Sequence, residues 1–409
     1  MMEKKDIWVV CSVCLVLLLA TMPAGAANRD FNSIDTIRIG VLTPVQLSPG
    51  QGIINACKMA ADEINAAGGI YGKKIELFYG DTEGKPEKGV TAAKKLVLQD
   101  KVDVLVGEYS SGVALAIQPY LSGYQTVFIG TGVASVELTD NVKKDYAKNK
   151  YFFRHMINAD RQADGVAAFM KDFVKPKLGV KKVAILAENA KWTDSTFGLK
   201  KDLEAAGMDV VFFERFDVDI KDFSPIFSKM KTQGVEWIVQ FLSHGASVPL
   251  VKAWQDNKPA PMGGCDVASM DHKFWDMTGG QCLYEITYNH IAPAKITDRT
   301  LPFWNTYLKR FGTNPVYTSG YSYDAVNFLA EVIKAKKSVK SDDIINGLET
   351  MSFKGVLHAQ TRFDKQSHDL AEGRYVMAFA QWREGGKKVV FYPEKFKTGD
   401  YMVPSWYKK

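Results

Sequence analysis

Cysteine is scarce in this sequence, and long runs of charge or of apolar residues are scarce as well. Five cysteines in 409 residues are too few for a fold built on disulfides. Lys and Arg number 52 and Asp and Glu 46, which gives a net charge of +6. The sequence has no long basic run of the kind that binds nucleic acid. The composition, 46% hydrophobic and 24% charged, is that of a globular chain. This length predicts two or three domains, and no nucleic-acid partner is expected.

Motifs that carry catalysis are also missing. The chain has no Gly-x-Ser-x-Gly elbow, no phosphate-binding Gly-x-x-x-x-Gly-Lys-Ser/Thr loop and no His-Glu-x-x-His pair. Gly130-Thr131-Gly132 starts like a dinucleotide fingerprint, but Ser135 stands where its third glycine would be. The histidines lack metal-ligand spacing, at positions 155, 244, 272, 290, 358 and 368. We therefore expect no enzyme, no catalytic residue, no metal and no cofactor.

The first residues predict a secretory signal peptide. Lys4 and Lys5 precede an apolar run, Ile7–Ala20, which is followed by the small residues of an Ala-x-Ala cleavage site. An uncleaved membrane anchor is the alternative, but the run is short for a spanning helix of about 20 residues. Removal of residues 1–26 would leave 409 − 26 = 383 residues. Because no later stretch is apolar enough to span a bilayer, we expect a mature protein exported to the periplasm and not embedded in the membrane.

Three cysteines remain after the signal peptide. Cys57 lies on the apolar face of an expected helix, which is typical of a buried small hydrophobe. Cys265 and Cys282 both flank glycine-containing loops, and export would place them in an oxidising compartment. A disulfide between them would stabilise the fold by about 3 kcal/mol in the chain-entropy model, but the sequence does not fix the geometry that such a bond requires.

The apolar pattern alternates between the periods of strands and helices. The first half predicts strands at 37–42, 74–79, 102–106 and 126–129, with helices at 53–67, 90–98 and 113–121. The pattern restarts with strands at 182–186, 209–213, 237–241 and around Met262, with helices at 198–206, 223–233 and 248–257. A late helix at 323–335 and a hairpin of 375–382 with 387–392 complete the expected elements. Such βαβ repetition builds parallel sheets, so the sequence predicts two α/β lobes.

Two facing lobes create a cleft, and ligand sites in open α/β sheets lie at the carboxyl ends of the strands. Tyr109, Ser110 and Ser111 follow one strand at the start of a helix, where hydroxyl and backbone N–H groups suit a carboxylate. The two serines are equally compatible with simple capping of that helix. Trp192 and Phe241 follow strands of the second lobe and either wall the cleft or belong to its core.

Two further loops carry candidate residues. Val133, Ala134 and Ser135 lie in the loop after the strand at 126–129 and offer backbone N–H groups and a hydroxyl. Asp266 follows a buried strand in a glycine-rich loop, where its carboxylate would neutralise an ammonium group on a ligand. The alternative for Asp266 is a turn or capping residue.

Several stretches of this chain resemble the extracytoplasmic binding proteins of branched-chain amino-acid ABC transporters. They are the long run AADEINAAGGIYGKKIEL at 60–77 and shorter matches at 39–44, 107–112, 136–139, 221–224 and 323–326. The resemblance extends from about Ile37 to the C-terminus and is more specific in the first lobe than in the second.

The resemblance implies the fold of periplasmic binding proteins of type I, two Rossmann-like lobes joined by a hinge of three crossovers. It also implies capture of a ligand by hinge closure and delivery to a membrane permease. The crossovers are expected at residues 153–154, 286–292 and 353–358. The lobes would then comprise residues 34–153 with 293–352, and residues 154–292 with 353–409.

The resemblance also assigns roles to four of the candidate residues. The serine that contacts an amino-acid head group falls on Ser111, and the backbone contact of the next loop falls near Val133. The acidic partner of the ligand's ammonium falls on or beside Asp266, and the aromatic lid of the second lobe falls on Trp192. Together these roles predict a small ligand, foremost an amino acid.

Some residues depart from the pattern of that family. The family's threonine in the second loop falls on Ala134, with Ser135 next to it, so a hydroxyl contact is lost or shifted. The first loop, residues 45–50, lacks the usual Ser-Gly pair, and Cys265 beside Asp266 is unusual. An aromatic acid or an amide is therefore an alternative ligand, and a sensor of the same fold is an alternative role.

Overall fold

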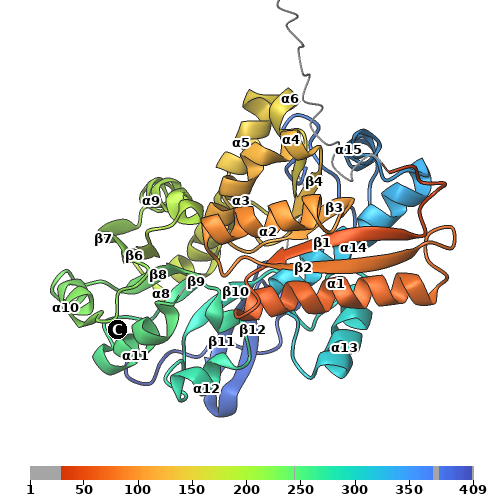
Figure 1. Ribbon diagram of the computed structural model, residues 1–409. Coiled ribbons are helices and arrows are strands. Elements are labelled where there is room, and N and C mark those ends of the chain that lie inside the picture. The colour runs from red at the N-terminus through yellow and green to blue at the C-terminus, as the bar shows by residue number, and fades with distance from the viewer. Residues whose placement is uncertain (1–28, 244, 372–376, 408–409) are drawn as a thin grey trace, which may run out of the picture.

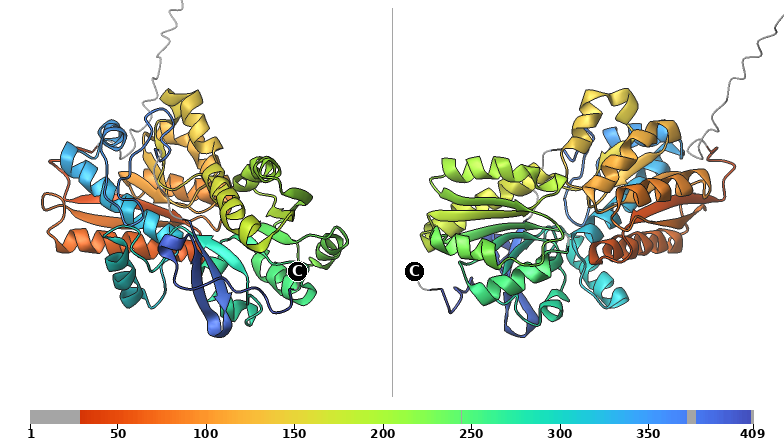
Figure 2. Two further views of the ribbon diagram at one scale, coloured as in Figure 1. Left: turned by 180° about the vertical axis from the view of Figure 1, so that it is seen from behind. Right: turned by 60° about the vertical axis from the view of Figure 1, so that its left-hand side comes forward.

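Two α/β lobes lie side by side in the computed structural model, which describes residues 29–243, 245–371 and 377–407 (Figures 1 and 2). The predicted signal peptide, residues 1–26, lies outside the described residues. Within those residues, no helix has both the length and the apolar character that crossing a bilayer requires. The right-hand view of Figure 2 shows one sheet in each lobe, with helices packed against it.

The first sheet has five parallel strands in the order β2-β1-β3-β4-β5. Its strands are β1 (Thr36–Thr43), β2 (Lys74–Asp81), β3 (Val104–Gly107), β4 (Val127–Gly130) and β5 (Phe152–Arg154). The helices along this part of the chain are α1 (Ser48–Ala66), α2 (Pro86–Leu98), α3 (Ser111–Ile117), α4 (Leu121–Tyr124), α5 (Glu137–Lys144) and α6 (Tyr146–Asn149). Every residue of β3 and β4 is buried, as expected for strands covered on both faces. The four predicted strands are confirmed, whereas β5 was expected only as a crossover.

Helix α1 begins at Ser48, five residues before the helix that the sequence predicts. The prediction treated Ser48–Gly52 as a loop because of its proline and glycines. Proline is compatible with the first turn of a helix, where its missing N–H has no intrahelical partner. Gly50 is needed for a different reason, since a Cβ there would lie 2.0 Å from the carbonyl oxygen of Pro44.

Three later helices return to the first lobe: α13 (Thr300–Phe311), α14 (Tyr317–Lys336) and α15 (Ser341–Thr350). Helix α14 packs beside α1 (Figure 1), where the Tyr323 hydroxyl donates a hydrogen bond of 2.5 Å to Glu63. It begins six residues before its predicted start. Its first two turns are rich in hydroxyl groups, yet these side chains are buried. Burial is possible because the hydroxyl groups find partners; the Thr318 hydroxyl, for example, donates to the Pro49 carbonyl at 2.8 Å.

The second sheet has seven strands in the order β12-β11-β10-β9-β8-β6-β7. Its strands are β6 (Lys182–Glu188), β7 (Asp209–Phe216), β8 (Trp237–Leu242), β9 (Gly263–Asp266), β10 (Ile286–Asn289), β11 (Ala378–Arg383) and β12 (Lys387–Tyr392). The accompanying helices are α7 (Ala159–Phe169), α8 (Lys175–Leu178), α9 (Thr196–Ala205), α10 (Ser224–Thr232), α11 (Ser247–Asn257) and α12 (Phe274–Thr278). Strands β6 to β10 pair in parallel, and β11 and β12 add an antiparallel hairpin. The predicted hairpin is confirmed from Ala378 on, with Gly385 and Gly386 at positive φ in its turn, whereas residues 375 and 376 of its expected first strand lie outside the described residues.

The chain passes between the two sheets three times, after β5, after β10 and after α15. Arg154, at the end of β5, is fully buried and forms a bidentate ion pair with Asp369 of the third passage, at 2.9 and 2.7 Å. This pair ties two of the three connecting segments together. The residue boundaries of the two lobes stay a prediction.

Cys265 and Cys282, whose bonding the sequence leaves open, form no disulfide with each other. Cys57, Cys265 and Cys282 are all buried, unpaired thiols. Cys265 packs in the same apolar cluster as Phe241, whereas Cys282 packs in a separate cluster with Trp382. Sequence spacing allowed the bond, but the two thiols belong to different cores of the second lobe. Burial raises the pKa of the Cys282 thiol to about 12, which keeps it protonated.

Candidate functional site

The loop that follows β3 turns sharply to bring Tyr109, Ser110 and Ser111 into the space between the lobes. Gly107 has φ +117°, and a Cβ there would lie 2.4 Å from the Leu42 carbonyl oxygen. Glu108 adopts φ 61°, which is rare for a residue with a side chain. Its carboxyl oxygen Oε1 accepts N–H bonds from Tyr109 at 2.9 Å and Ser110 at 2.7 Å. Burial raises the pKa of Glu108 to about 7.

Ser111 connects this loop to the loop after β4. Its Oγ accepts backbone N–H bonds from Ala134 at 3.0 Å and Ser135 at 3.1 Å. Because both lone pairs of the oxygen are then occupied, the hydroxyl hydrogen is left to donate to a ligand. Ser110 is the N-cap residue of α3, but its side chain makes no capping bond, so simple side-chain capping does not explain this serine pair.

A cavity lies between the two lobes, and its 530 Å³ of empty space includes solvent at its open side. Sites for small molecules occur preferentially at such interfaces between domains. Five of the nine predicted site residues line it: Tyr109, Ser110, Ser111, Ala134 and Trp192. The structure adds lining residues that the sequence analysis missed, namely Gly112, Gly132, Met156, Gln162, Ala190, Lys191, Ser243, Cys265, Val267, Met270, His290 and Tyr317.

Three predicted site residues lie directly behind this lining. Ser135 supports Ser111 through its N–H, and the Val133 side chain is buried against Gly130. Phe241 packs behind Trp192 with ring centroids 5.8 Å apart. These residues shape the walls of the cavity, but the prediction that their side chains line it is not met.

Asp266 also lies outside the cavity, because the pleat of β9 turns its side chain away. Its neighbours Cys265 and Val267 line the cavity, whereas Asp266 Oδ1 accepts from the Ser247 hydroxyl at 2.7 Å. The Asp266 carboxyl also hydrogen-bonds the buried carboxyl of Glu285, and burial raises the pKa of Asp266 to about 6. Asp266 therefore belongs to a structural polar cluster behind the cavity. The prediction that a ligand's ammonium lies beside Asp266 is therefore wrong for this cavity.

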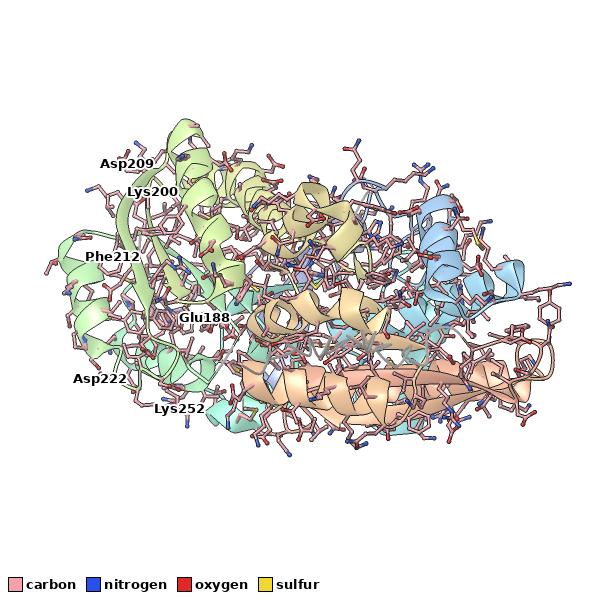
Figure 3. The ribbon with its side chains drawn as sticks, turned by 45° about the horizontal axis from the view of Figure 1, so that its top comes forward. Glu188, Lys200, Asp209, Phe212, Asp222 and Lys252 are labelled. Carbon is pink, nitrogen blue, oxygen red and sulfur yellow. The ribbon has the colours of Figure 1, made fainter. Side chains whose placement is uncertain are left out.

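The second lobe contributes an aromatic wall held by a buried carboxylate. The Trp192 indole N–H donates to Glu188 Oε1 and to the Ser243 hydroxyl, each at 2.9 Å. Figure 3 shows Glu188 at the inner edge of the second lobe, whereas Asp209 and Asp222 lie at its outer side. Glu188 lies two residues after the strand predicted at 182–186, and β6 extends to include it. Its role was missed because a single acidic residue in a loop gives no sign of a buried hydrogen bond to Trp192.

The two lobes touch each other across the cleft. The Tyr109 hydroxyl of the first lobe donates to the Ser243 carbonyl of the second. The Ser48 hydroxyl at the start of α1 donates to Asp271. Lys191 forms an ion pair of 3.2 Å with Glu137. These bridging contacts define a closed arrangement around the cavity.

One residue of a connecting segment and one of α7 complete the lining. His290 follows β10, and its Nδ1 lies 3.1 Å from the Tyr321 hydroxyl. Gln162 Oε1 accepts from the Tyr288 hydroxyl at 2.6 Å. Burial lowers the pKa of His290 to about 3, so its imidazole is neutral. Position inside a predicted crossover was the only available signal for His290, and it does not show which way the side chain points.

The charge of the lining is sparse. Within residues 29–243, 245–371 and 377–407, no Asp or Glu lines the cavity, and the charged lining residue Lys191 is paired with Glu137. Those ranges also contain no group of three His, Cys, Asp or Glu side chains arranged to hold a metal ion. The cavity thus offers hydrogen-bond donors and apolar surface, with no counter-charge for a cation among the described lining residues.

Residues 36–387 match the sequence model of the periplasmic binding proteins, and the chain belongs to that family. Leu/Ile/Val-binding protein homolog 7 of Brucella abortus is 24% identical over 95% of this chain and 98% of its own length. The fold resembles a solute-binding protein of an R. palustris ABC transporter in complex with 4-hydroxybenzoate, with TM-score 0.75, 21% identity and coverage of 91% and 99%. It also resembles a branched-chain amino acid substrate-binding protein of Streptococcus pneumoniae in complex with isoleucine, with TM-score 0.73, 23% identity and coverage of 86% and 97%.

These matches confirm the predicted two-lobed fold of a type I periplasmic binding protein. The relatives are solute-binding proteins of ABC transporters and not enzymes, which agrees with the prediction from the sequence. The chain is thus a binding protein of this class.

Proposed function

We propose that this protein captures a small monocarboxylate without an ammonium group in the periplasm and delivers it to an ABC transporter permease. The observation that carries the proposal is the lining of the cavity. It offers the Ser111 hydroxyl to a carboxylate, and its described residues offer no carboxylate to an ammonium. Leaving an ammonium in such a site without a counter-charge is unfavourable.

The first lobe supplies the groups that suit a carboxylate. The Ser111 oxygen accepts hydrogen bonds from two backbone N–H groups, which leaves its hydroxyl hydrogen to donate to the ligand. The N–H groups of Ser111 and Gly112 belong to the first turn of α3 and have no partner within the helix. Hydrogen bonds to an ionised acceptor are about twice as strong as neutral ones.

The remaining lining suits an apolar or aromatic body. Trp192 presents its ring to the cavity while its N–H is engaged with Glu188 and Ser243. Met156, which follows β5, and Val267 and Met270, which follow β9, supply apolar surface from two other segments. The solved relative in complex with 4-hydroxybenzoate supports an aromatic acid as the ligand. This is the alternative ligand class that the sequence departures left open.

An amino acid is the second candidate ligand. The curated relative is named a Leu/Ile/Val-binding protein homolog, and a solved relative binds isoleucine. A larger cavity adjoins the first and shares Tyr109, Ser243 and Val267 with it. That outer cavity is lined by Asp219 and Asp271, which can neutralise an ammonium. An amino acid that spans both cavities would use these carboxylates.

A thermal-shift screen with matched ligands separates the two candidates. Leucine and 4-methylpentanoate have the same carbon skeleton and differ by the ammonium group, and benzoate adds the aromatic body. A ligand at about 100 times its Kd stabilises the folded state by about 2.7 kcal/mol. We expect 4-methylpentanoate and benzoate to raise the Tm more than leucine does at equal concentration. Stronger stabilisation by leucine would overturn the monocarboxylate proposal in favour of the amino acid.

Delivery to a permease is tested by transport. We expect deletion of the gene to abolish uptake of the radiolabelled acid by whole cells, and the mature N-terminus of the periplasmic protein to follow residue 26. Uptake that persists at the wild-type rate would contradict delivery and favour a sensor role.

A further inference from the structure

The hinge presents one polar side chain to the cavity that the capture of a carboxylate does not use. His290 lies directly after β10 and lines the cavity beside Gln162 and Tyr317. Its ring stacks on Tyr288, with centroids 5.5 Å apart and an interplanar angle of 13°. A second ring, that of Tyr317, lies at a centroid distance of 5.5 Å. The imidazole is therefore held in place by aromatic rings from two segments.

The hydrogen bonds of His290 leave one nitrogen for a ligand. Nδ1 lies 3.1 Å from the Tyr321 hydroxyl. Nε2 has no hydrogen-bond partner among the described residues, although the side chain is buried in the wall of the cavity. The neighbouring Gln162 is already engaged, because its amide donates to the Ile157 carbonyl and its Oε1 accepts from Tyr288. A polar ligand group at this wall would meet Nε2.

The surroundings of His290 favour an uncharged partner. Burial, with the nearby His358 as a smaller cause, lowers the pKa of His290 to about 3, so the ring carries no charge at physiological pH. A neutral imidazole can donate or accept one hydrogen bond at Nε2, depending on its tautomer. A second ligand carboxylate would find no cation here, whereas a hydroxyl can serve as donor or acceptor.

We propose that His290 Nε2 hydrogen-bonds a hydroxyl group on the ligand, which makes the site selective for hydroxylated aromatic monocarboxylates. The inference rests on the proposed function, because it assumes that the ligand is a small carboxylic acid. Specificity then has two sources. Ser111 recognises the carboxylate common to all such acids, and His290 distinguishes the hydroxylated ones. Discrimination arises because an analogue without the hydroxyl leaves Nε2 buried and unpaired.

A ladder of probe ligands tests this with the wild-type protein. Isothermal titration calorimetry would compare benzoate with its 2-, 3- and 4-hydroxy isomers and with the three methylbenzoates, which match the hydroxy isomers in size. We expect one hydroxy isomer to bind about tenfold tighter than benzoate and than its methyl counterpart, the size of one buried hydrogen bond. If benzoate binds and no hydroxy isomer gains, the inference is overturned while the proposed function stands.

Variants of His290 test whether the tighter binding of the hydroxy isomer depends on this side chain. We expect His290→Leu to lose the tenfold preference because it weakens binding of the hydroxy isomer more than binding of benzoate, and His290→Gln to restore part of the preference. His358→Leu is the matched control, because His358 also packs on Tyr321, with centroids 5.9 Å apart, but is not among the described lining residues. The control should keep the preference.

Each remaining outcome is decisive. Equal loss of benzoate and hydroxybenzoate affinity in a folded His290→Leu protein would show that His290 acts on the shared part of the ligand, which overturns the inference. If His290→Leu fails to fold, Tyr321→Phe removes the hydroxyl at Nδ1 instead. We then expect a selective loss for the hydroxy isomer, and an unchanged preference would overturn the proposal. If no benzoate binds while leucine does, the proposed function fails and the inference fails with it.

Discussion

The two lobes contribute to the cavity in different ways. The first lobe presents a loop whose donors are oriented by backbone contacts, with Ser111 held by the N–H groups of Ala134 and Ser135. The second lobe presents a tryptophan, Trp192, and turns the carboxyl of Asp266 into its interior. Under the proposed function, the first lobe would recognise the ligand's carboxylate and the second would cover its body. Such a division suits a binding protein in which closure adds contacts, since a ligand shifts a conformational equilibrium only by differential affinity.

The largest effect is expected where the hinge supports the first-lobe loop. Arg154 is fully buried, donates to the Ser135 carbonyl at 2.5 Å and pairs with Asp369. Arg154→Leu would leave the Asp369 carboxylate without its partner, so we expect a loss of about 3–5 kcal/mol in the free energy of unfolding. Denaturant unfolding measures this. A loss below about 1 kcal/mol would contradict the assigned role, and Arg154→Lys should fall between the two.

Ser111 gives the next largest effect, on binding. Ser111→Ala removes the donor and leaves the N–H groups of Ala134 and Ser135 unpaired, so we expect a loss of about 1–3 kcal/mol in binding free energy. Calorimetry with the best ligand of the screen would show the Kd rising by about 5- to 150-fold. Ser110→Ala is the matched control and should change the Kd less than threefold. Similar losses for both serines would contradict the view that Ser111 is the oriented donor.

Glu108 predicts a pH dependence of stability. In the folded protein burial raises its pKa from 4.5 to about 7, so the unfolded chain releases this proton at lower pH. Ionisation therefore favours the unfolded state, and stability falls as pH rises from about 4.5 to about 7, by at most about 1.4 kcal/mol per pH unit for one proton. Because glutamine resembles the protonated acid, Glu108→Gln should flatten this part of the profile. An identical slope in the variant would contradict the assignment.

Asp266 gives the smallest effect on binding and the sharpest contrast with Ser111. Because its carboxyl faces Ser247 and Glu285 behind the cavity, Asp266→Asn should change the Kd less than about twofold. The measurement is again calorimetry, with Ser111→Ala measured alongside as the variant expected to lose affinity. A loss above about tenfold for Asp266→Asn would restore Asp266 as a ligand-binding residue.

The lobes, most strands and the loop after β3 could be predicted from the sequence, because the hydrophobic period reveals the strands and helices and a position after a strand end indicates the binding edge of the sheet. It could not show which face of β9 is turned to the cavity. A shift of one residue reverses the side-chain direction in a strand, and so Cys265 and Val267 line the cavity while Asp266 does not. Phe241 was misplaced for another reason, since it shares the face of its partner Cys265 but is covered by Trp192.

The hinge residues were missed for a different reason. His290 lies in a connecting segment, whereas Gln162 lies in α7, where no helix was predicted. At neither position did hydrophobic periodicity or a motif predict the direction of the side chain. Glu108 was missed because its φ of 61° is a conformation that favours glycine, so nothing in the sequence predicts that a glutamate adopts it. In each case the missing information is the tertiary packing of segments far apart in the chain.

Direct competition between two matched acids tests the central claim, that the cavity receives a carboxylate without an ammonium. Equimolar leucine and 4-methylpentanoate would be added to the ligand-free mature protein, and native mass spectrometry would report which adduct forms. We predict the 4-methylpentanoate complex at one ligand per chain and little leucine complex. A leucine complex as the main species would contradict the account.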